Sequence, residues 1–273
     1  MKNKISSIGF IVLISIALDF NACRKSERDS DKDTSAASDN ATAENVFAGI
    51  FKSIGEFSDS TTQLRTASCA SFSVDSVGAN SWPKTLTINF DTINCLGADG
   101  NNRRGKIIAT FTGRYRDSLT TISISLVNFY FNDNLVQVGT HTIINKGHNV
   151  AGNLIYSINV QNASITNTSN QTIKWNSVRS REWISGENTR LNPWDDVYLI
   201  TGSADGTAKN GNTFTAIINT PLRVALNCRW IEAGVFTITP QNLSPRIIDF
   251  GNGTCDANVT VSINGNIQNI TMQ

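Results

Sequence analysis

From about residue 84 onward, hydrophobic and polar positions alternate with a period of two in many short segments. Residues 85–90 have the sequence Thr-Leu-Thr-Ile-Asn-Phe, and residues 121–126 alternate in the same way. This period is typical of β-strands that bury one face and expose the other. Between such segments stand turn-forming pairs that include Lys146–Gly147, Asp205–Gly206 and Asn264–Gly265. Because Asn-Gly and Asp-Gly favour tight hairpins, the pattern predicts a long antiparallel meander.

The predicted fold class is therefore all-β. We expect residues 44–273 to form a single domain, since all-β domains often reach about 200–250 residues. The pattern does not decide whether the meander forms an open curved sheet, a sandwich or a partial barrel.

One segment before the strands has the period of a helix. Its large apolar side chains recur along one helical stripe, and they are Val46, Phe47, Ile50, Phe51, Ile54 and Phe57. Thr42 is a candidate N-cap, with Glu44 in the first turn. The polar face lacks the basic residues of membrane-surface helices, which favours packing of this amphipathic N-terminal helix against the sheet.

Residues 1–22 are predicted to be a lipoprotein signal peptide. Lys2 and Lys4 precede an apolar run over residues 8–18, which is shorter than the roughly 20 residues that span a bilayer. Ala22 before Cys23 resembles the lipobox of bacterial lipoproteins, and this resemblance implies acylation of Cys23. Two or more acyl chains give stable membrane anchoring.

Two features follow the predicted anchor. Arg24, rather than Asp, follows Cys23, and by the same resemblance this implies sorting to the outer membrane. Residues 23–43 contain no aromatic or large aliphatic side chain. Such a composition buries too little surface to offset its ordering entropy, so we predict a lipid-anchored flexible tether.

The four remaining cysteines are even in number, as expected for two disulfides in an exported protein. Cys69 lies 26 residues before Cys95, and Cys228 lies 27 residues before Cys255. Similar segments end at Cys95 and Cys255, which favours the pairs Cys69–Cys95 and Cys228–Cys255, although four cysteines permit three connectivities. The spacing lacks the close cysteine pairs of a zinc site.

Charge and composition exclude some classes of function. Without the first 22 residues the chain has 21 basic and 21 acidic residues in 251. A nucleic-acid-binding protein normally carries a clustered basic surplus, so no nucleic-acid partner is expected.

The chain has little material for catalysis or for a cofactor. His141 and His148 are its two histidines, and we interpret them as surface residues of a strand or turn. No phosphate-binding loop, zinc-protease motif or nucleophile elbow occurs, so we expect no cofactor and no metal. The oxygen-rich stretches at residues 98–102 and 249–256 do not match a calcium loop.

Four carboxylates keep an enzymatic alternative open. Asp195 and Asp196 are adjacent, and Glu182 lies near Glu187. Two carboxylates about 5–9.5 Å apart could serve a glycosidase. We expect instead that Asp195 and Asp196 begin a strand and that Glu182 is a solvated residue.

The segment from Ile173 to Trp183 has an unusual face. If it is a strand, Trp175, Arg179, Arg181 and Trp183 lie on one side of it. This possible binding face could stack on sugar rings or contact a partner protein. In the alternative interpretation, which we prefer, the tryptophans cover the edge of the core and cross-strand arginines stack on them.

Several motifs together resemble a family of uncharacterised Bacteroidetes lipoproteins over roughly residues 45–272. They are CLGADG at 95–100, RRGKI at 103–107, FTGRY at 111–115, VRSREW at 178–183 and IDFGNGTCD at 248–256. The resemblance implies export, lipid anchoring and an all-β body, and it implies no activity and no catalytic residue.

We therefore expect a non-enzymatic lipoprotein, anchored in the outer membrane by its N-terminal lipid, with a binding or envelope-structural role. Its body would face the cell surface or the periplasm, and its partner would be a glycan or an envelope protein. The alternatives are a surface polysaccharide hydrolase and a periplasm-facing lipid or lipoprotein carrier.

Overall fold

The computed structural model describes residues 31, 33–59, 69–76, 81–97, 99–189, 192–228 and 230–271. Within them, one α-helix, α1 (Ser35–Asp59), precedes the strands, and a 3-10 helix, η1 (Pro193–Asp195), precedes β10. The strands are β1 (Ser71–Ser76), β2 (Lys84–Asn89), β3 (Cys95–Leu96), β4 (Asn102–Phe111), β5 (Thr121–Phe131), β6 (Asn134–Gln137), β7 (Thr140–His148), β8 (Leu154–Thr166), β9 (Thr172–Ser185), β10 (Val197–Thr207), β11 (Thr213–Ala225), β12 (Ile231–Pro240), β13 (Arg246–Asn252), β14 (Asn258–Ile263) and β15 (Asn266–Thr271).

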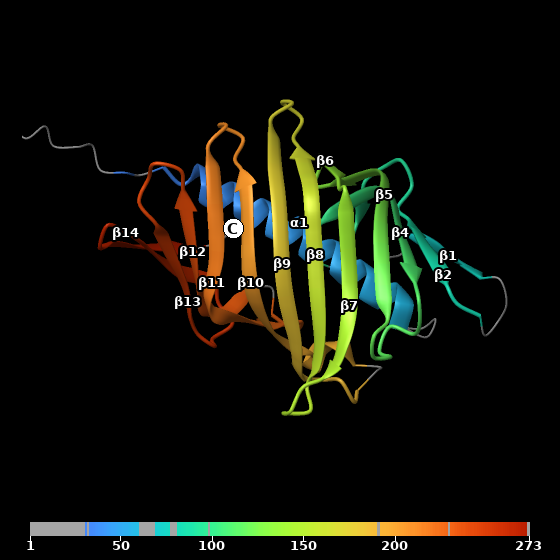
Figure 1. The fold of residues 1–273 in the computed structure, drawn as a ribbon. Helices are drawn as coiled ribbons and strands as arrows, with labels where there is room; N and C mark the ends of the chain where they lie inside the picture. The colour runs from blue at the N-terminus through green and yellow to red at the C-terminus, as the bar shows by residue number, and fades with distance from the viewer. Residues whose placement is uncertain are drawn as a thin grey trace, which may run out of the picture. The chain divides into compact units, whose positions relative to one another are not determined.

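The described strands form one antiparallel sheet of fifteen strands, mostly in chain order (Figure 1). The order along the sheet runs from β1 through β2, β4, β5, β6 and β8 to β15, while β3 pairs with β4 and β7 lies against β5 and β8. β1 and β15 are the two ends of this order. The all-β meander is thus confirmed, in the form of an open curved sheet.

The sheet bends because several strand pairs contain bulges, which increase local twist. The register of β10 against β11 shifts between Ile200 and Ser203, and Gly202 between them has a φ of +124°. A Cβ on Gly202 would come within 2.1 Å of the carbonyl oxygen of Val178 on β9. Only glycine therefore allows the close strand approach at this bend.

Two of the predicted turns are wrong. Lys146–Gly147 lies inside β7, at a register shift against β8. Asp205–Gly206 lies inside β10, where a Cβ on Gly206 would meet the carbonyl oxygen of Lys174 at 2.4 Å and the ring of Phe214 at 2.7 Å. The glycine there makes room for a neighbouring side chain, a packing role that a dipeptide preference does not reveal.

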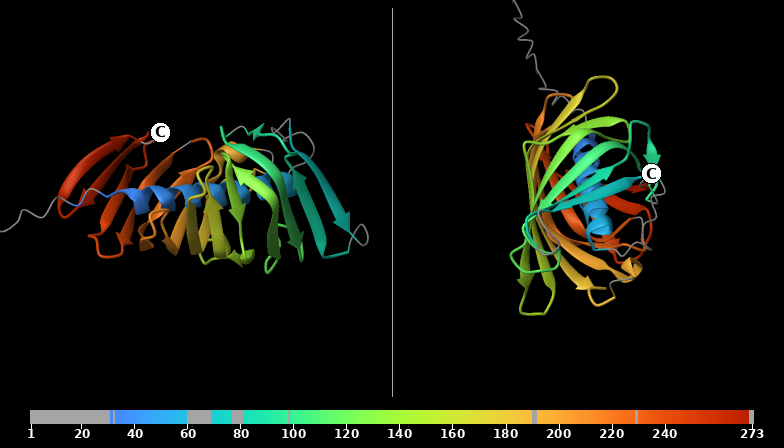
Figure 2. Two further views of the ribbon diagram at one scale, coloured as in Figure 1. Left: turned by 90° about the horizontal axis from the view of Figure 1, so that it is seen from above. Right: turned by 90° about the vertical axis from the view of Figure 1, so that its right-hand side faces the viewer.

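Helix α1 crosses the concave face of the sheet, which curves around it (Figure 2). The predicted apolar stripe is buried in the core, since each of its members is at most 7% exposed: Val46, Phe47, Ile50, Phe51, Ile54 and Phe57. The opposing side chains come from the concave face of the strands and include Ile107, Ile143 and Trp175. The amphipathic helix is thus confirmed, and it closes the core that the open sheet alone would leave exposed.

The helix begins at Ser35, seven residues before the candidate N-cap Thr42. Asp33 lies two residues before the first residue of the helix, and its Oδ1 accepts the backbone N–H of Ser35 at 2.8 Å. Thr42 is not an N-cap, because it lies inside the helix and its hydroxyl donates to the carbonyl of Ser38 at 2.9 Å.

The tether predicted for residues 23–43 is therefore wrong over its described part. Asp39 and Asn40 are buried, and Oδ2 of Asp39 accepts the backbone N–H of Lys209 at 2.7 Å. Small residues bring this end of the helix close to the sheet, and Oδ1 of Asn40 accepts the Nε1–H of Trp175 at 3.0 Å. The signal peptide, Cys23 and the charged residues that follow it lie outside the described residues.

Both predicted disulfides are present. Cys69 is bonded to Cys95 and Cys228 to Cys255. The first joins the segment before β1 to β3, and the second joins the β11–β12 connection to the loop between β13 and β14.

Candidate functional site

The possible binding face predicted on β9 is buried beneath α1. Trp175, Arg179, Arg181 and Trp183 are 1%, 5%, 8% and 4% exposed. A face covered to this degree cannot contact a glycan or a partner protein, so its prediction as a binding face is wrong. The alternative interpretation is confirmed in that both tryptophans lie in the core, but Trp175 stacks on Phe47 of the helix and not on a cross-strand arginine.

Contacts with the helix explain this burial. The ring of Trp175 stacks on Phe47 with 5.1 Å between centroids, and its Nε1 donates to Asn40 Oδ1 at 3.0 Å. Arg179 forms an ion pair with Glu44 of the helix. The face therefore holds α1 on the sheet by a stacked ring, a buried hydrogen bond and an ion pair.

Arg181 is surrounded by aromatic rings. Its guanidinium lies 4.0 Å from the ring centroid of Phe51 and 5.0 Å from that of Tyr198, and Tyr198 in turn packs against Trp183. Burial lowers the pKa of Arg181, and the π-faces of the rings compensate part of the lost hydration. This arginine is a core residue.

The two histidines differ in environment. His141 is buried edge-on against Phe47, which contradicts its interpretation as a surface residue, and burial lowers its pKa to about 3. A neutral imidazole in this position acts as an aromatic core residue. The side chain of His148 is half exposed, and its Nε2 lies 2.8 Å from Glu187 Oε1.

The structure does not gather the four candidate carboxylates into a cavity. Glu182 accepts hydrogen bonds from two asparagine side chains at 2.7–2.8 Å, and Glu187 contacts His148. Asp195 is partly buried on η1 and accepts from Thr189, whereas Asp196 is buried. None of the four lines the cavity at β13–β15 or the cavity near the C-terminal end of α1.

Because Asp196 has a raised pKa in the folded protein, we predict that stability depends on pH. Burial raises its pKa to about 6, while Tyr198 donates to its Oδ2 at 3.2 Å. Between about pH 4 and 6 the folded protein holds a proton that the unfolded chain has released, so the free energy of unfolding falls as the pH rises through this range. We expect Asp196→Asn to lose this slope in urea titrations between pH 4 and 7. The same slope in both proteins would contradict the assignment.

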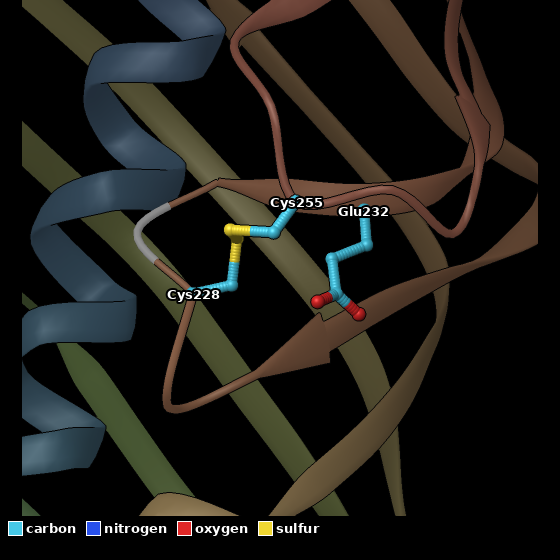
Figure 3. A group of neighbouring side chains, drawn as sticks. All are labelled: Cys228, Glu232 and Cys255. Carbon is cyan, nitrogen blue, oxygen red and sulfur yellow. A yellow bond between two sulfur atoms is a disulfide. The ribbon is translucent and has the colours of Figure 1, made fainter.

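The sulfur atoms of Cys228 and Cys255 and a carboxylate oxygen of Glu232 lie within 4.8 Å of one another (Figure 3). The two sulfur atoms are joined in a disulfide, so neither is available as a thiolate ligand. Glu232 forms an ion pair with Arg223. This group is therefore a structural cross-link.

Beside this cross-link lies a cavity with a volume of about 440 Å³. We call it the polar cup. Its wall is the loop between β13 and β14 together with neighbouring strand residues, and most of its side chains are polar: Asp249, Phe250, Gly251, Asn252, Thr254, Asp256, Asn258, Val259, Thr260 and Asn269.

Local hydrogen bonds hold the wall of the polar cup in place. Oδ1 of Asp249 accepts the backbone N–H of Gly251 at 2.8 Å, and Oδ1 of Asp256 accepts that of Asn258 at 2.7 Å. The backbone N–H of Gly253 donates to the carbonyl of Glu232 on β12 at 2.9 Å. Together with the disulfide at Cys255, these bonds preorganise the loop.

The polar cup includes the second oxygen-rich stretch of the sequence. The sequence showed that residues 249–256 are rich in side-chain oxygens, but it did not predict that Asn269 of β15 would line the same cavity. The first oxygen-rich stretch has a different role, because Asp99 forms an ion pair with Arg103 at 2.6 Å.

Among the described residues, no helix combines the length and the apolar character needed to cross a bilayer. Comparison of the chain with protein-family models, curated proteins and solved structures gives no match.

Proposed function

We propose that this protein is a non-enzymatic outer-membrane lipoprotein, anchored through acylated Cys23, and that it binds a neutral glycan in the polar cup. The observation that carries the proposal is the chemistry of the cup. Asn252, Asn258 and Asn269 line it together with threonine hydroxyls and two carboxylates. Side-chain amides both donate and accept hydrogen bonds, and carboxylates accept them, as the hydroxyl groups of a sugar require.

Size and shape agree with a small polar ligand. The cavity of about 440 Å³ lies within the range of roughly 300–1,000 Å³ typical of small-molecule sites. Phe250 contributes a ring to the lining, and such a ring packs against the apolar face of a pyranose. A concave site of this size favours a glycan over an envelope protein, whose interface normally buries about 800 Å² on each partner.

The two alternative functions have less support. A polysaccharide hydrolase would need its carboxylates in a substrate site, and Glu182, Glu187, Asp195 and Asp196 do not line the polar cup. A carrier that shelters lipid along the whole concave face would need that face open, and α1 fills much of it.

Glycan binding should depend on Asn269. We expect Asn269→Ala to weaken the binding of a neutral oligosaccharide by about tenfold, because an amide contact in a preorganised site contributes about 1.4 kcal/mol. The ligand would be selected with the full chain on an array of neutral and acidic glycans and then measured by calorimetry.

The matched control is Asn266→Ala, since Asn266 is exposed on the same strand but does not line the polar cup. Equal losses in both variants would contradict the site. The absence of any array ligand would contradict the function.

Anchoring is tested by changing the proposed lipidation site. In wild-type cells we expect the protein to remain in the outer-membrane fraction, and Cys23→Ala should release it, because the acyl chains provide the stable attachment. Fractionation followed by immunoblotting measures both. Proteinase treatment of intact cells, with a periplasmic protein as the leakage control, shows which side the body faces. Retention of the variant in the membrane would contradict a lipid anchor.

A further inference from the structure

The open sheet ends in two edge strands, β1 and β15. Among the described strands, β14 alone pairs with β15, through six consecutive residue pairs that run from Asn258 with Thr271 to Ile263 with Asn266. The outer side of an edge strand presents backbone N–H and C=O groups with which a further strand can pair. All six residues of β15 are exposed. The described part of the chain therefore leaves this edge accessible.

β15 lacks the features that normally protect an edge strand, which are charged side chains, proline, bulges and covering elements. Its sequence, Asn-Ile-Gln-Asn-Ile-Thr, contains no charge and no proline. Its register against β14 shows no shift, so no bulge twists the strand away. In contrast, β1 carries the exposed Asp75. A charge thus protects one edge of the sheet, whereas the other edge is neutral.

An apolar row on the convex face ends at the same neutral edge. Ile217, Ile247 and Ile267 are 52%, 44% and 70% exposed. Successive cross-strand pairs connect them through Thr237 on β12 and Ser262 on β14. Because cross-strand partners share one face of a sheet, the three isoleucines lie in one row across β11 to β15. A strand added at β15 would cover part of Ile267, and burial of this apolar surface is favourable.

From these observations we propose that β15 is a dimerisation edge, which pairs antiparallel with β15 of a second copy of this chain. Edge-to-edge pairing needs an accessible strand on both partners, and a second copy supplies the same neutral strand. A twofold axis perpendicular to the sheet relates the copies, so their convex faces lie on the same side and their isoleucine rows meet.

Pairing of β15 with β1 of the next copy is less favourable. It would bring the charge of Asp75 next to a neutral edge that offers it no partner. It would also repeat from copy to copy without closing, whereas the twofold pairing uses one edge of each copy and stops at a dimer.

The proposed interface is small. At about 3.4 Å per residue, β15 is roughly 20 Å long. One added strand pair covers less surface than the roughly 1,600 Å² of a standard stable interface. We therefore expect a dimer that dissociates on dilution.

Sedimentation velocity of the full chain with Cys23→Ala measures this association without a protein-linked acyl chain. We expect a monomer–dimer equilibrium within the range from about 1 μM to 1 mM. Hydrogen–deuterium exchange at the two ends of this range should show slower exchange of the β15 amides in the dimer, because pairing protects them.

Gln268 is the position that locates the interface, because it is exposed in the middle of β15. When the two strands overlap over most of their length, this residue lies opposite or diagonal to Gln268 of the second copy, so one substitution brings two like charges together. Gln268→Lys and Gln268→Glu should each weaken dimerisation by about tenfold or more. An equimolar mixture of the two variants should recover most of it, because the charges are then complementary.

Ser73→Lys is the control, since Ser73 is exposed in the middle of the other edge strand, β1. It should leave the dimer unchanged. A protein that stays monomeric throughout would overturn the proposal, and so would association that the Gln268 variants leave intact or that their mixture does not recover. Association beyond a dimer that Ser73→Lys abolishes would indicate pairing of β15 with β1 instead.

The inference does not rest on the proposed glycan site, because Gln268 does not line the polar cup. Glycan binding by a strictly monomeric protein would reject the dimer alone. A dimer that binds no glycan would reject the proposed function alone.

Discussion

Trp175→Ala is expected to lower the free energy of unfolding by about 4 kcal/mol, within the range for truncating a large aromatic residue in a core. The indole is 1% exposed, stacks on Phe47 and donates to Asn40. Its loss leaves a cavity between β9 and α1 and a buried amide without its donor. Urea titration monitored by circular dichroism measures the change.

The control for this variant lies three positions along the same strand. Val178 is 53% exposed, on the convex face of β9, and Val178→Ala should change stability by less than about 0.5 kcal/mol. If Trp175→Ala abolished ligand binding while leaving stability unchanged, the face beneath α1 would be a binding surface after all.

The second large loss of stability is expected when the ion pair between Asp31, which precedes the helix, and Arg246 is broken. Asp31→Ala should destabilise the protein by about 3 kcal/mol, because removing one partner of a buried ion pair leaves the other charge uncompensated. Nη1 of Arg246 donates to Asp31 Oδ2 at 2.7 Å, and the arginine side chain is 1% exposed. Arg246 also binds the segment before the helix through Asp33, because its Nη2 and Nε donate to the backbone carbonyl of Asp33 at 2.6 and 3.0 Å.

The pairing is tested by a double-mutant cycle. Asp31→Ala combined with Arg246→Met should be less destabilised than the sum of the single variants, because the double variant buries no uncompensated charge. Asp75→Ala, at an exposed aspartate on β1, is the control. A stable Asp31→Ala variant would contradict a stabilising role for this ion pair.

The elements that the sequence predicted well depend on local chemistry. Period-two alternation over residues 85–90 and 121–126 matches β2 and the first half of β5. The stripe from Val46 to Phe57 matches the buried face of α1. The two disulfides followed from nearly equal spacing between similar segments.

The candidate sites were less accessible to prediction. The strand pattern placed Trp175, Arg179, Arg181 and Trp183 on one face, but alternation alone does not show which face of an open sheet a helix covers. The polar cup combines the end of β13, the following loop and the start of β14 with Asn269, and the cavity near the C-terminal end of α1 combines that helix with three strands. Which residues meet at these cavities depends on how the strands pair and how the sheet curves.

By itself, then, the sequence determined the all-β class, the meander, the apolar stripe of the helix and the cysteine pairs, because each depends on neighbours or on simple spacing. Only the tertiary structure decided where α1 begins, since Asp31 and Asp39 are held by partners 215 and 170 residues away. It also decided which polar residues are buried, because their burial is stabilised by contacts that form only when the sheet curves around the helix.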